Sequence, residues 1–541
     1  MAEKAQRILM VCTQSGLGKG GVPVFNWQLS EALAKEHHVT LLTTRPDTPP
    51  HEGVTLLHTP EPPLMAGPGS DPWEERVWLE WCAQHDPRTF GLPAAGDNAF
   101  DVIVGHSRFS GPAAAQLRER WYPSAKLAHF LHTSPEKLPP AKYPDDPQMI
   151  TLKTERDLGL ELECMSRSDI VVGVGPLLRG EAEKITSGLS SRPSVHELVP
   201  GTRIFEPVTP AGSQERLNVL AMGRADDPLK GFRDVAIAVN DLNAAGIDVR
   251  LTVLGANEEN LAVAKKQFAV LAGHENVEVK AFIKNPDQLM AEVRTADAVI
   301  MPSKHEGFGM VATEALGHGI PVLVNQDSGA AQFLGDQNRI PADIGSPCVV
   351  PEPAPSQRRP DMWANAIAQL KEELPQRREG ARQLQQELRK YSWTHGSTAF
   401  VTATEDAVHI RTRTTLQAQQ TVATTVQGPN GTVLRSDAAN PRTVGPQEQS
   451  HDRTQRTAQV QESQKQPQNQ TAVSPSLATA PVMNVQQLAA LRSAKMPGPA
   501  GQPAHQSQQG THGPGVPRQT PLPHKRPGPG PAPAGGDTPR R

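Results

Sequence analysis

Thiols, membrane-length apolar runs and clustered metal ligands are all scarce in this 541-residue sequence. Its four cysteines, Cys12, Cys82, Cys164 and Cys348, lie far apart and form no Cys-x-x-Cys pair, which argues against a zinc ribbon or a redox dithiol. Sparse thiols fit a reducing cytoplasm. No apolar stretch approaches the ~20 residues of a membrane span, and "MAEKAQRILMVCTQ" does not fit a signal peptide. We therefore expect a cytoplasmic protein.

A strong charge of either sign is also missing, since the formal net charge is −3, and we expect no nucleic-acid partner. The charge is unevenly distributed, because residues 411–541 hold 14 Lys and Arg against 5 Asp and Glu. No Phe, Trp or Tyr occurs after residue 411. A segment of this kind cannot bury enough apolar surface to offset its ordering entropy. We expect residues 413–541 to be a disordered, basic, Gln/Pro/Ser/Thr-rich tail, with a peripheral membrane or protein contact left open.

The sequence contains two blocks in which strand-like runs alternate with helical patterns. Continuous Val/Ile/Leu runs are typical of strands buried on both faces, and helices between them imply parallel pairing. We therefore predict two doubly wound α/β domains, at 1–205 and 206–393, with a linker near 199–214. The predicted strands are 7–12, 38–44, 100–106, 126–132 and 169–175 in the first block, and 216–223, 248–255, 276–283, 297–303 and 321–326 in the second.

Residues 60–99 interrupt the first block with a turn-rich stretch and a helical pattern at 73–85 that carries three tryptophans. A loop of this length is uncommon unless it is functional or disordered. Two interpretations stay open: a lid over an acceptor site, or an inserted helix whose tryptophans pack beneath it.

The stretch "CTQSGLGKGGVPVFNWQLSEALA" (12–34) contains Gly16-x-Gly18-x-x-Gly21 between a strand and a helix. Glycines at such a turn allow the backbone to approach a diphosphate, and the helix N-terminus favours negative charge. A dinucleotide site also needs an acidic residue at the end of the second strand, and Thr43 and Thr44 stand there. The loop alone therefore indicates a nearby phosphate or a tight turn.

The stretch "ADAVIMPSKHEGFGMVATEALGHGIPVL" (296–323) places Glu306 before a predicted helix and Glu314 within it. The amides of Phe308, Gly309 and Met310 would form an anion site at the helix start, and Gly307 and Gly309 would let a ligand approach the backbone. A nucleotide sugar fits this pattern, because hydroxyl groups flank its central diphosphate. The alternative is a surface glutamate and a capping glutamate.

Two cations follow the first strand of the second block in "AMGRADDPLKGF" (221–232). Open α/β sheets bind ligands at the carboxyl ends of their strands, so Arg224 and Lys230 could neutralise a leaving diphosphate there. The alternative is a pair of solvated charges that pair with Asp226 and Asp227.

Together these stretches resemble glycosyltransferase family 4, the retaining nucleotide-sugar transferases of the GT-B fold. The resemblance covers residues 7–405 and rests on "GRADDPLKG", on "EGFGMVATE" followed by "ALGHGIPVL", and on the first-block stretch "GGVPVFNWQLSEALA". It implies two Rossmann-like domains that face each other across a cleft, with the donor held mostly by the second domain. It also implies a closing helix near 394–410 that crosses back to the first domain.

The resemblance implies roles for residues of both domains. In the second domain, Arg224 and Lys230 would hold the donor diphosphate, Glu306 would contact the donor sugar, and Glu314 would contact the ribose. In the first domain, the residues implied to line the cleft or bind substrate are Gly20, Gly21, His132 in "HFLHTS" and His106 in "VGHSRFSG", the last toward the acceptor.

The resemblance further implies catalysis without a metal or cofactor, and the absence of any Asp-x-Asp pair agrees with that. The expected donor is a UDP-, GDP- or ADP-sugar, and the acceptor is an unidentified glycan, lipid or small molecule. One stretch departs from the family: where a Gly-Gly-x-x-Glu sequence is usual, this chain has "QDSGAAQFL" (326–334). Three alternatives remain: another GT-B enzyme such as a nucleotide-sugar epimerase or phosphorylase, a glycosidase using Glu306 and Glu314, and a non-catalytic binding protein acting through its tail.

Overall fold

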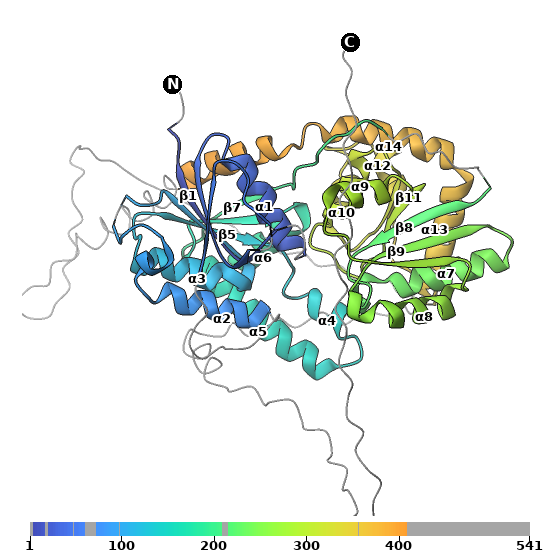
Figure 1. The fold of residues 1–541 in the computed structure, drawn as a ribbon, viewed down its shortest axis with the longest axis horizontal. Coiled ribbons are helices and arrows are strands. Elements are labelled where there is room, and N and C mark those ends of the chain that lie inside the picture. The colour runs from blue at the N-terminus through green and yellow to red at the C-terminus, as the bar shows by residue number, and fades with distance from the viewer. Residues whose placement is uncertain are drawn as a thin grey trace, which may run out of the picture. The chain divides into compact units, whose positions relative to one another are not determined.

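A computed structural model describes residues 4–407 except 17–19, 47, 60–71, 97, 208–214 and 355 (Figure 1). The predicted tail and the first part of the predicted 60–99 loop lie outside the described residues. No helix in the described part of the chain has both the length and the apolar character needed to cross a bilayer.

The first domain is built on a seven-stranded parallel sheet with the order β3-β2-β1-β4-β5-β6-β7. Its strands are β1 (Arg7–Ser15), β2 (His38–Pro46), β3 (Val54–His58), β4 (Val102–His106), β5 (Lys126–Leu131), β6 (Ile170–Val174) and β7 (Ser194–Leu198). Its helices are α1 (Gly21–Leu33), α2 (Pro72–Ala83), α3 (Ser107–Arg120), α4 (Leu138–Lys142), α5 (Pro147–Arg167) and α6 (Pro176–Thr186).

Strand β1 shows why the first sheet is buried on both faces. Ile8 and Met10 pack in one hydrophobic cluster with α1 and α6, whereas Leu9 and Val11 pack in another with α2 and α3. All four side chains are fully buried, so the strand reads as an unbroken apolar run in the sequence. Trp78 of α2 lies in the second cluster and is 6% exposed, which corresponds to the packed-helix interpretation of this insertion.

The second domain contains a six-stranded parallel sheet with the order β10-β9-β8-β11-β12-β13. Its strands are β8 (Leu217–Met222), β9 (Val249–Ala256), β10 (Val277–Ala281), β11 (Ala298–Met301), β12 (Val322–Asn325) and β13 (Val349–Val350). Its helices are α7 (Phe232–Ala244), α8 (Leu261–Ala272), α9 (Pro286–Val293), α10 (Met310–Gly317), α11 (Gly329–Gly335), α12 (Ala342–Gly345), α13 (Arg359–Glu372) and α14 (Leu374–Leu388).

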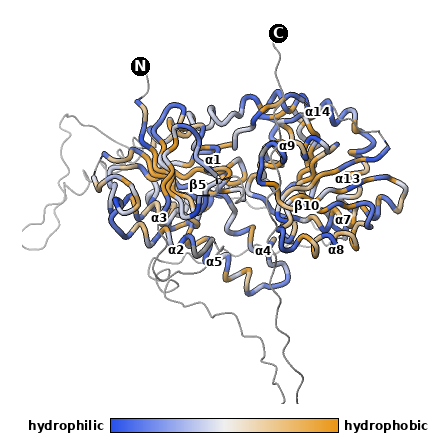
Figure 2. Tube along the Cα trace, viewed as in Figure 1, coloured by the Kyte–Doolittle hydropathy of each residue, from blue (hydrophilic) through white to orange (hydrophobic). Residues whose placement is uncertain are grey.

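One hydrophobic cluster continues from the first domain into the second. Helices α7, α8 and α13 cover one face of the second sheet in a cluster of their own, whereas α10, α11 and α14 cover the other face within the cluster that also contains α1. Figure 2 shows that the strands of both sheets consist mainly of hydrophobic residues, whereas the helices carry hydrophilic residues on their outer faces. The two domains are therefore joined by apolar packing as well as by the chain.

The last described segment, helical over residues 393–407, lies against the first domain (Figure 1). The Trp393 ring lies 5.2 Å from the Phe25 ring on α1, and the Phe400 ring lies 5.2 Å from the Phe130 ring on β5. Lys126 Nζ donates a hydrogen bond to the Thr404 carbonyl at 3.0 Å. Within the described residues, the chain thus enters the second domain, leaves it through α14, and returns to the first domain.

The sequence did not predict three strands, β3, β7 and β13. Strands β3 and β7 are the edges of the first sheet, and β13 is the two-residue edge of the second. Edge strands are short and half-exposed, so the pattern of a buried strand is weak in them. Each of the ten predicted strands overlaps a strand of the structure.

Candidate functional site

The loop between β11 and α10 holds the glutamate-rich motif at the carboxyl end of the second sheet. Gly309 caps α10 with a φ of 96°, and a Cβ at this position would lie 2.4 Å from Met301 Sδ. Only glycine therefore fits this turn. The loop is also bonded to the segment after β12: Glu306 N donates to Asp327 O at 3.2 Å, and Ala330 N donates to Phe308 O at 2.7 Å.

Four consecutive amides at the start of α10 are available to a ligand. The backbone N–H groups of Gly307, Phe308, Gly309 and Met310 have no hydrogen-bond partner within the described residues. Unpaired N–H groups at a helix N-terminus, together with the helix dipole, favour an anion. Three of these four amides, those of Phe308, Gly309 and Met310, are the donors at which the sequence predicts an anion.

The Glu306 carboxylate forms an ion pair with Lys230, in which Nζ lies 2.7 Å from Oε2. Both side chains are only about one-quarter exposed or less. Burial alone would raise the pKa of Glu306, but Lys230, with smaller contributions from Ser303 and His305, holds that pKa below its usual value. Glu306 is therefore ionised at neutral pH, and the two predicted site residues form one charge-balanced unit.

Arg224 lies in the same loop as Lys230 but is much more exposed. Its side chain is 70% exposed and forms a 2.7 Å ion pair with Asp227. The other Asp227 oxygen accepts a 3.1 Å hydrogen bond from Leu229 N and so caps the 3-10 turn η2 (Pro228–Lys230). The alternative interpretation was that the two cations are solvated charges that pair with Asp226 and Asp227. Arg224 does pair with Asp227, and it lies at the edge of the loop that positions Lys230.

Glu314 is the fifth residue of α10, and its side chain forms no ion pair or hydrogen bond with the described residues. Burial raises its pKa above the usual range. An unpaired, partly buried carboxyl group is unfavourable for stability unless a ligand hydroxyl satisfies it.

The first domain places His132 directly against the motif loop. A Cβ on Gly307 would lie 2.1 Å from the His132 carbonyl oxygen, so this contact requires glycine. A second close contact joins Gly175 to Phe308, since a Cβ on that glycine would lie 2.4 Å from the Phe308 ring. His132 and the Glu306 loop are thus brought together from different domains.

The other predicted first-domain residues lie at the carboxyl ends of neighbouring strands or at the start of α1. His106 ends β4, is fully buried, and contacts His132 through ring nitrogens 2.9 Å apart. Gly20 caps α1 with a φ of 98°, and Cβ atoms on Gly20 and Gly21 would meet no described atom within 4 Å. The described residues therefore leave room for a ligand to approach the backbone at these two glycines.

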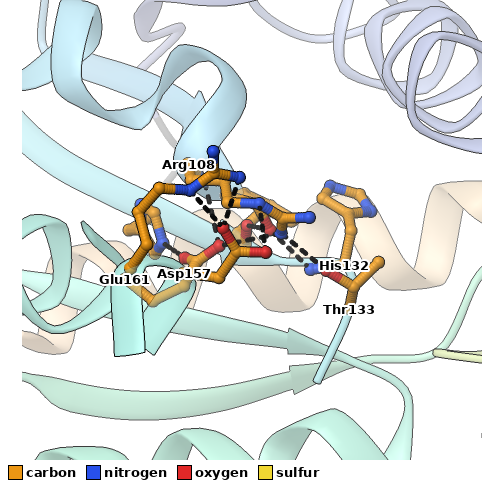
Figure 3. Close-up of polar contacts among 9 residues, drawn as sticks. Arg108, His132, Thr133, Asp157 and Glu161 are labelled. Carbon is orange, nitrogen blue, oxygen red and sulfur yellow. Dashed lines mark hydrogen bonds and ion pairs between the residues drawn. The ribbon is translucent and has the colours of Figure 1, made fainter. Parts of the chain in front are cut away.

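A buried ionic cluster around Arg108 was not predicted (Figure 3). Figure 3 shows the Arg108 guanidinium beside two carboxylates of α5, with Thr133 on its other side. Arg108 Nε lies 3.3 Å from Asp157 Oδ2, Nη1 lies 3.7 Å from Glu161 Oε1, and Nη1 donates to Thr133 Oγ1 at 3.0 Å. His129 Nε2 lies 2.8 Å from the second Glu161 oxygen. The only sequence signal was Arg108 next to His106, and the carboxylates lie about 50 residues away.

A cavity of about 500 Å³ opens beside the motif loop and is lined by residues of both domains. Lys137 of the first domain reaches Asp327 of the second at 3.1 Å, and Asp327 also accepts a 3.2 Å contact from His305 Nδ1. The lining residues are Lys137, Ala141, Lys304, Gln326, Asp327, Gln332, Glu352 and Arg359. Within the described residues, no group of three or more His, Cys, Asp and Glu side chains is arranged to hold a metal ion.

Comparison with solved structures supports the fold. Sucrose-phosphate synthase from Thermosynechococcus elongatus matches with a TM-score of 0.57 and 20% identity, covering 75% of this chain and all of that one. A structure from E. coli described as trehalose-6-phosphate bound with UDP-2-fluoro glucose matches with a TM-score of 0.51 and 15% identity, over 74% and 98% of the two chains.

Comparison of sequences identifies the family. The D-inositol 3-phosphate glycosyltransferase of Xylanimonas cellulosilytica is 26% identical over 420 residues, which cover 72% of this chain and 92% of the relative. The family model described as "Family 4 Glycosyltransferase in conflict systems" matches residues 9–400. The chain therefore belongs to glycosyltransferase family 4, and it is a glycosyltransferase of the GT-B type.

Proposed function

We propose that the chain transfers a sugar from a nucleotide-diphosphate sugar to an acceptor hydroxyl, with retention of anomeric configuration and without a bound metal ion. The observation that carries the proposal is the Lys230–Glu306 ion pair beside the four amides of 307–310, which have no hydrogen-bond partner in the described part of the chain. An ionised carboxylate can accept from sugar hydroxyls, and the amides and a cation next to it can hold a diphosphate.

Each part of a nucleotide sugar has a counterpart in this site. The amides of 307–310 and Lys230 face the diphosphate, Glu306 accepts from hydroxyls of the donor sugar, and the unpaired Glu314 accepts from the ribose. Arg224, exposed and tethered to Asp227, can move toward the distal phosphate. The UDP-2-fluoro glucose named for the E. coli structure of the same fold supports a donor of this class.

The reaction that this geometry supports is a front-face displacement. The bond from the anomeric carbon to the phosphate oxygen breaks while the acceptor oxygen bonds to the same face, and the acceptor proton passes to the departing phosphate oxygen. The protein's contribution is to hold both substrates and to stabilise the negative charge that develops on the leaving diphosphate. Lys230, Arg224 and the dipole of α10 supply the positive charge.

A donor panel tests the proposal. The full-length chain is first screened by thermal shift against UDP-, GDP- and ADP-sugars, since a bound donor must raise the melting temperature. Release of nucleotide diphosphate is then measured in the presence of EDTA, and the anomeric configuration of the product is read by NMR. We expect one donor class to stabilise the fold and to be turned over with retention; inversion or strict dependence on added metal would contradict the mechanism.

A pair of lysine variants makes this test specific to the site. Lys230→Ala should lower kcat/KM by roughly 100- to 1,000-fold, the range found when one preorganised donor to a developing oxyanion is removed. The control is Lys265→Ala, an exposed lysine on α8 that should leave kcat/KM unchanged. Equal activity in the two variants would rule out the assigned role of Lys230.

A further inference from the structure

Three buried polar side chains form a hydrogen-bonded chain that ends at His132, the residue in contact with the motif loop. His106 Nε2 lies 2.6 Å from Asn26 Oδ1, and His106 Nδ1 lies 2.9 Å from His132 Nε2. Asn26 and His106 are fully buried and His132 is 9% exposed. The three residues come from α1, from the end of β4 and from the residue after β5, so only the folded domain brings them together.

The direction of each hydrogen bond follows from the chemistry of neutral imidazole, which has one N–H donor and one acceptor nitrogen. An amide oxygen can only accept, so His106 Nε2 carries the proton that it donates to Asn26 Oδ1. His106 Nδ1 is then an acceptor, and His132 Nε2 must carry the proton between the two rings. His132 Nδ1 is left with a lone pair, which accepts no hydrogen bond from the described residues.

Both rings are held in the neutral state on which this reasoning depends. Burial, with a smaller effect of His129, lowers the pKa of His106 to about 3. Burial, followed by the effects of His106 and His129, lowers the pKa of His132 well below its usual value. Neither ring therefore donates from both nitrogens near neutral pH.

The position of His132 is fixed by several further contacts. Its ring packs edge-on against Phe25 with centroids 4.9 Å apart, and its backbone N–H donates to Ser107 Oγ at 3.0 Å. Ser107 has a φ of 43°, an uncommon conformation for a residue other than glycine, and its hydroxyl donates to Phe130 O at 3.3 Å. Strained backbone next to His132 indicates that its placement is maintained at a cost to stability.

We propose that Asn26 and His106 are positioning residues that fix His132 as the Nε2–H tautomer, so that its Nδ1 accepts a hydrogen bond from a hydroxyl of the bound sugar. The tautomer assignment is independent of catalysis, whereas the sugar hydroxyl rests on the proposed function. The carbonyl of His132 contacts Gly307, so the ring lies next to the residues assigned to the donor sugar.

Histidine NMR of the full-length protein tests the tautomer directly. Protein labelled with ¹⁵N-histidine gives long-range proton–nitrogen spectra in which protonated and bare ring nitrogens differ in shift, and His106→Gln and His132→Gln assign the two residues. We expect His132 to show a protonated Nε2 and a bare Nδ1, with no titration between about pH 6 and 8. A protonated Nδ1, which the reverse orientation of the Asn26 amide would produce, would overturn the proposal.

Variants of Asn26 test whether the asparagine sets the tautomer. Asn26→Leu removes the acceptor and should allow both tautomers of His132, with kcat/KM lowered by roughly tenfold or more, as is usual when the group that orients a functional histidine is lost. Asn26→Asp keeps an oxygen that accepts from His106 Nε2, so it should retain the tautomer and most of the activity. An unchanged His132 spectrum in Asn26→Leu would refute the role of Asn26.

A control on the same helix separates positioning from general loss of packing. Ser30→Ala removes another buried side-chain hydrogen bond of α1, from Ser30 Oγ to Trp27 O at 2.7 Å, and should leave the His132 spectrum and kcat/KM unchanged. Melting temperatures of all three variants show whether the fold persists. If no nucleotide sugar is turned over, the proposed function fails, but the spectra still decide the tautomer. An equal loss of kcat/KM in Ser30→Ala and Asn26→Leu would count against the positioning role.

Discussion

The two domains contribute to the site in opposite ways. In the first domain the polar groups are built into the core: Asn26, His106 and Glu161 are fully buried and Arg108 is 6% exposed. In the second domain the polar groups stand on loops at the sheet edge, where the Lys230 and Glu306 side chains are 21% and 25% exposed and Arg224 is 70% exposed.

This difference separates stability from function. A buried polar network is costly when one member is removed, because its partners lose their hydrogen bonds without regaining water. A loop charge that is accessible to water can be replaced at little cost to the fold. We therefore expect substitutions in the Arg108 cluster of the first domain to act mainly on stability, and substitutions in the second-domain motif to act mainly on ligand binding and turnover.

The largest expected effect comes from removing the charge at the centre of the Arg108 cluster. Arg108→Met should lower the free energy of unfolding by about 3 kcal/mol or more, since the fully buried Glu161 carboxylate then loses its arginine partner. Urea denaturation of the wild type and the variant measures this change.

An exposed arginine of the same domain serves as the control for Arg108. Arg88→Ala breaks a pair with Asp86 in which the arginine side chain is 70% exposed, and should leave the free energy of unfolding close to that of the wild type. If Arg108→Met were as mild as this control, the first-domain network would not be part of the structural core, and the contrast between the domains would be lost.

The next prediction concerns the contact that joins the two regions. Gly307→Ala would place a methyl group 2.1 Å from the His132 carbonyl oxygen, so the motif loop and the first domain must move apart. We expect kcat/KM to fall by about 100-fold, the effect of a displacement near 1 Å in a positioned site. Both domains keep their own cores, so the loss of stability should be smaller than for Arg108→Met.

A second glycine of the same domain controls for the added methyl group. A Cβ on Gly335, the last residue of α11, meets nothing within 4 Å, so Gly335→Ala should leave kcat/KM unchanged. Wild-type activity in Gly307→Ala would show that the two regions need not be in close contact during the reaction.

How much the sequence could reveal differs between the two regions for a physical reason. Arg224, Lys230, Glu306 and Glu314 fall within two short stretches, because one loop and one loop-to-helix turn hold them all. The two α/β domains were likewise predictable, since strands buried on both faces are continuous apolar runs.

The first-domain network was not predictable as a unit. His106 and His132 were identified through a resemblance, but Asn26, Arg108 and Glu161 were not, because they come from α1, α3 and α5 and share no spacing. Only the pairing of β1, β4 and β5 brings these segments to one sheet edge. The short edge strands were missed for a related reason. They form because they pair with the strand beside them in the sheet, and their own sequence has no strong strand pattern.

A smaller effect should follow from loosening an ion pair between the domains. Arg339 binds Glu197 of β7 through two hydrogen bonds of 2.5 and 2.9 Å, and its Nε donates to Asp336 at 2.7 Å. Arg339→Ala should lower kcat/KM by about fivefold, because a partly exposed bidentate pair is worth about 1 kcal/mol. The difference from wild type should shrink as salt is added.

A pair confined to the second domain provides the comparison for Arg339. Arg358 pairs with Asp361, and its side chain is 66% exposed, so Arg358→Ala should not change kcat/KM. An equal response of the two variants would mean that the Arg339 pair has no part in holding the domains together.

The smallest effect tests whether Glu314 is kept for a ligand rather than for the fold. Its pKa is raised by burial, so the ionised form is less stable in the folded chain than in the unfolded chain. The ionised Glu314 therefore lowers the free energy of unfolding at any pH above its folded-state pKa. This loss disappears as the pH is lowered past that pKa, because the carboxyl group becomes protonated. Glu314→Gln should therefore raise the melting temperature by roughly 1–3 °C at pH 7, and the gain should vanish near pH 4.

The same substitution should weaken donor binding, because a neutral amide accepts less strongly from ribose hydroxyls than a carboxylate does. The thermal shift produced by a saturating donor should thus be smaller in Glu314→Gln than in the exposed-site control Glu372→Gln on α13, whose own melting temperature should match the wild type. A substitution that raises stability and weakens ligand binding indicates that the original side chain is retained for function. A lower melting temperature in Glu314→Gln would instead assign the carboxylate to the fold, and it would remove Glu314 from the second-domain residues that we assign to ligand binding.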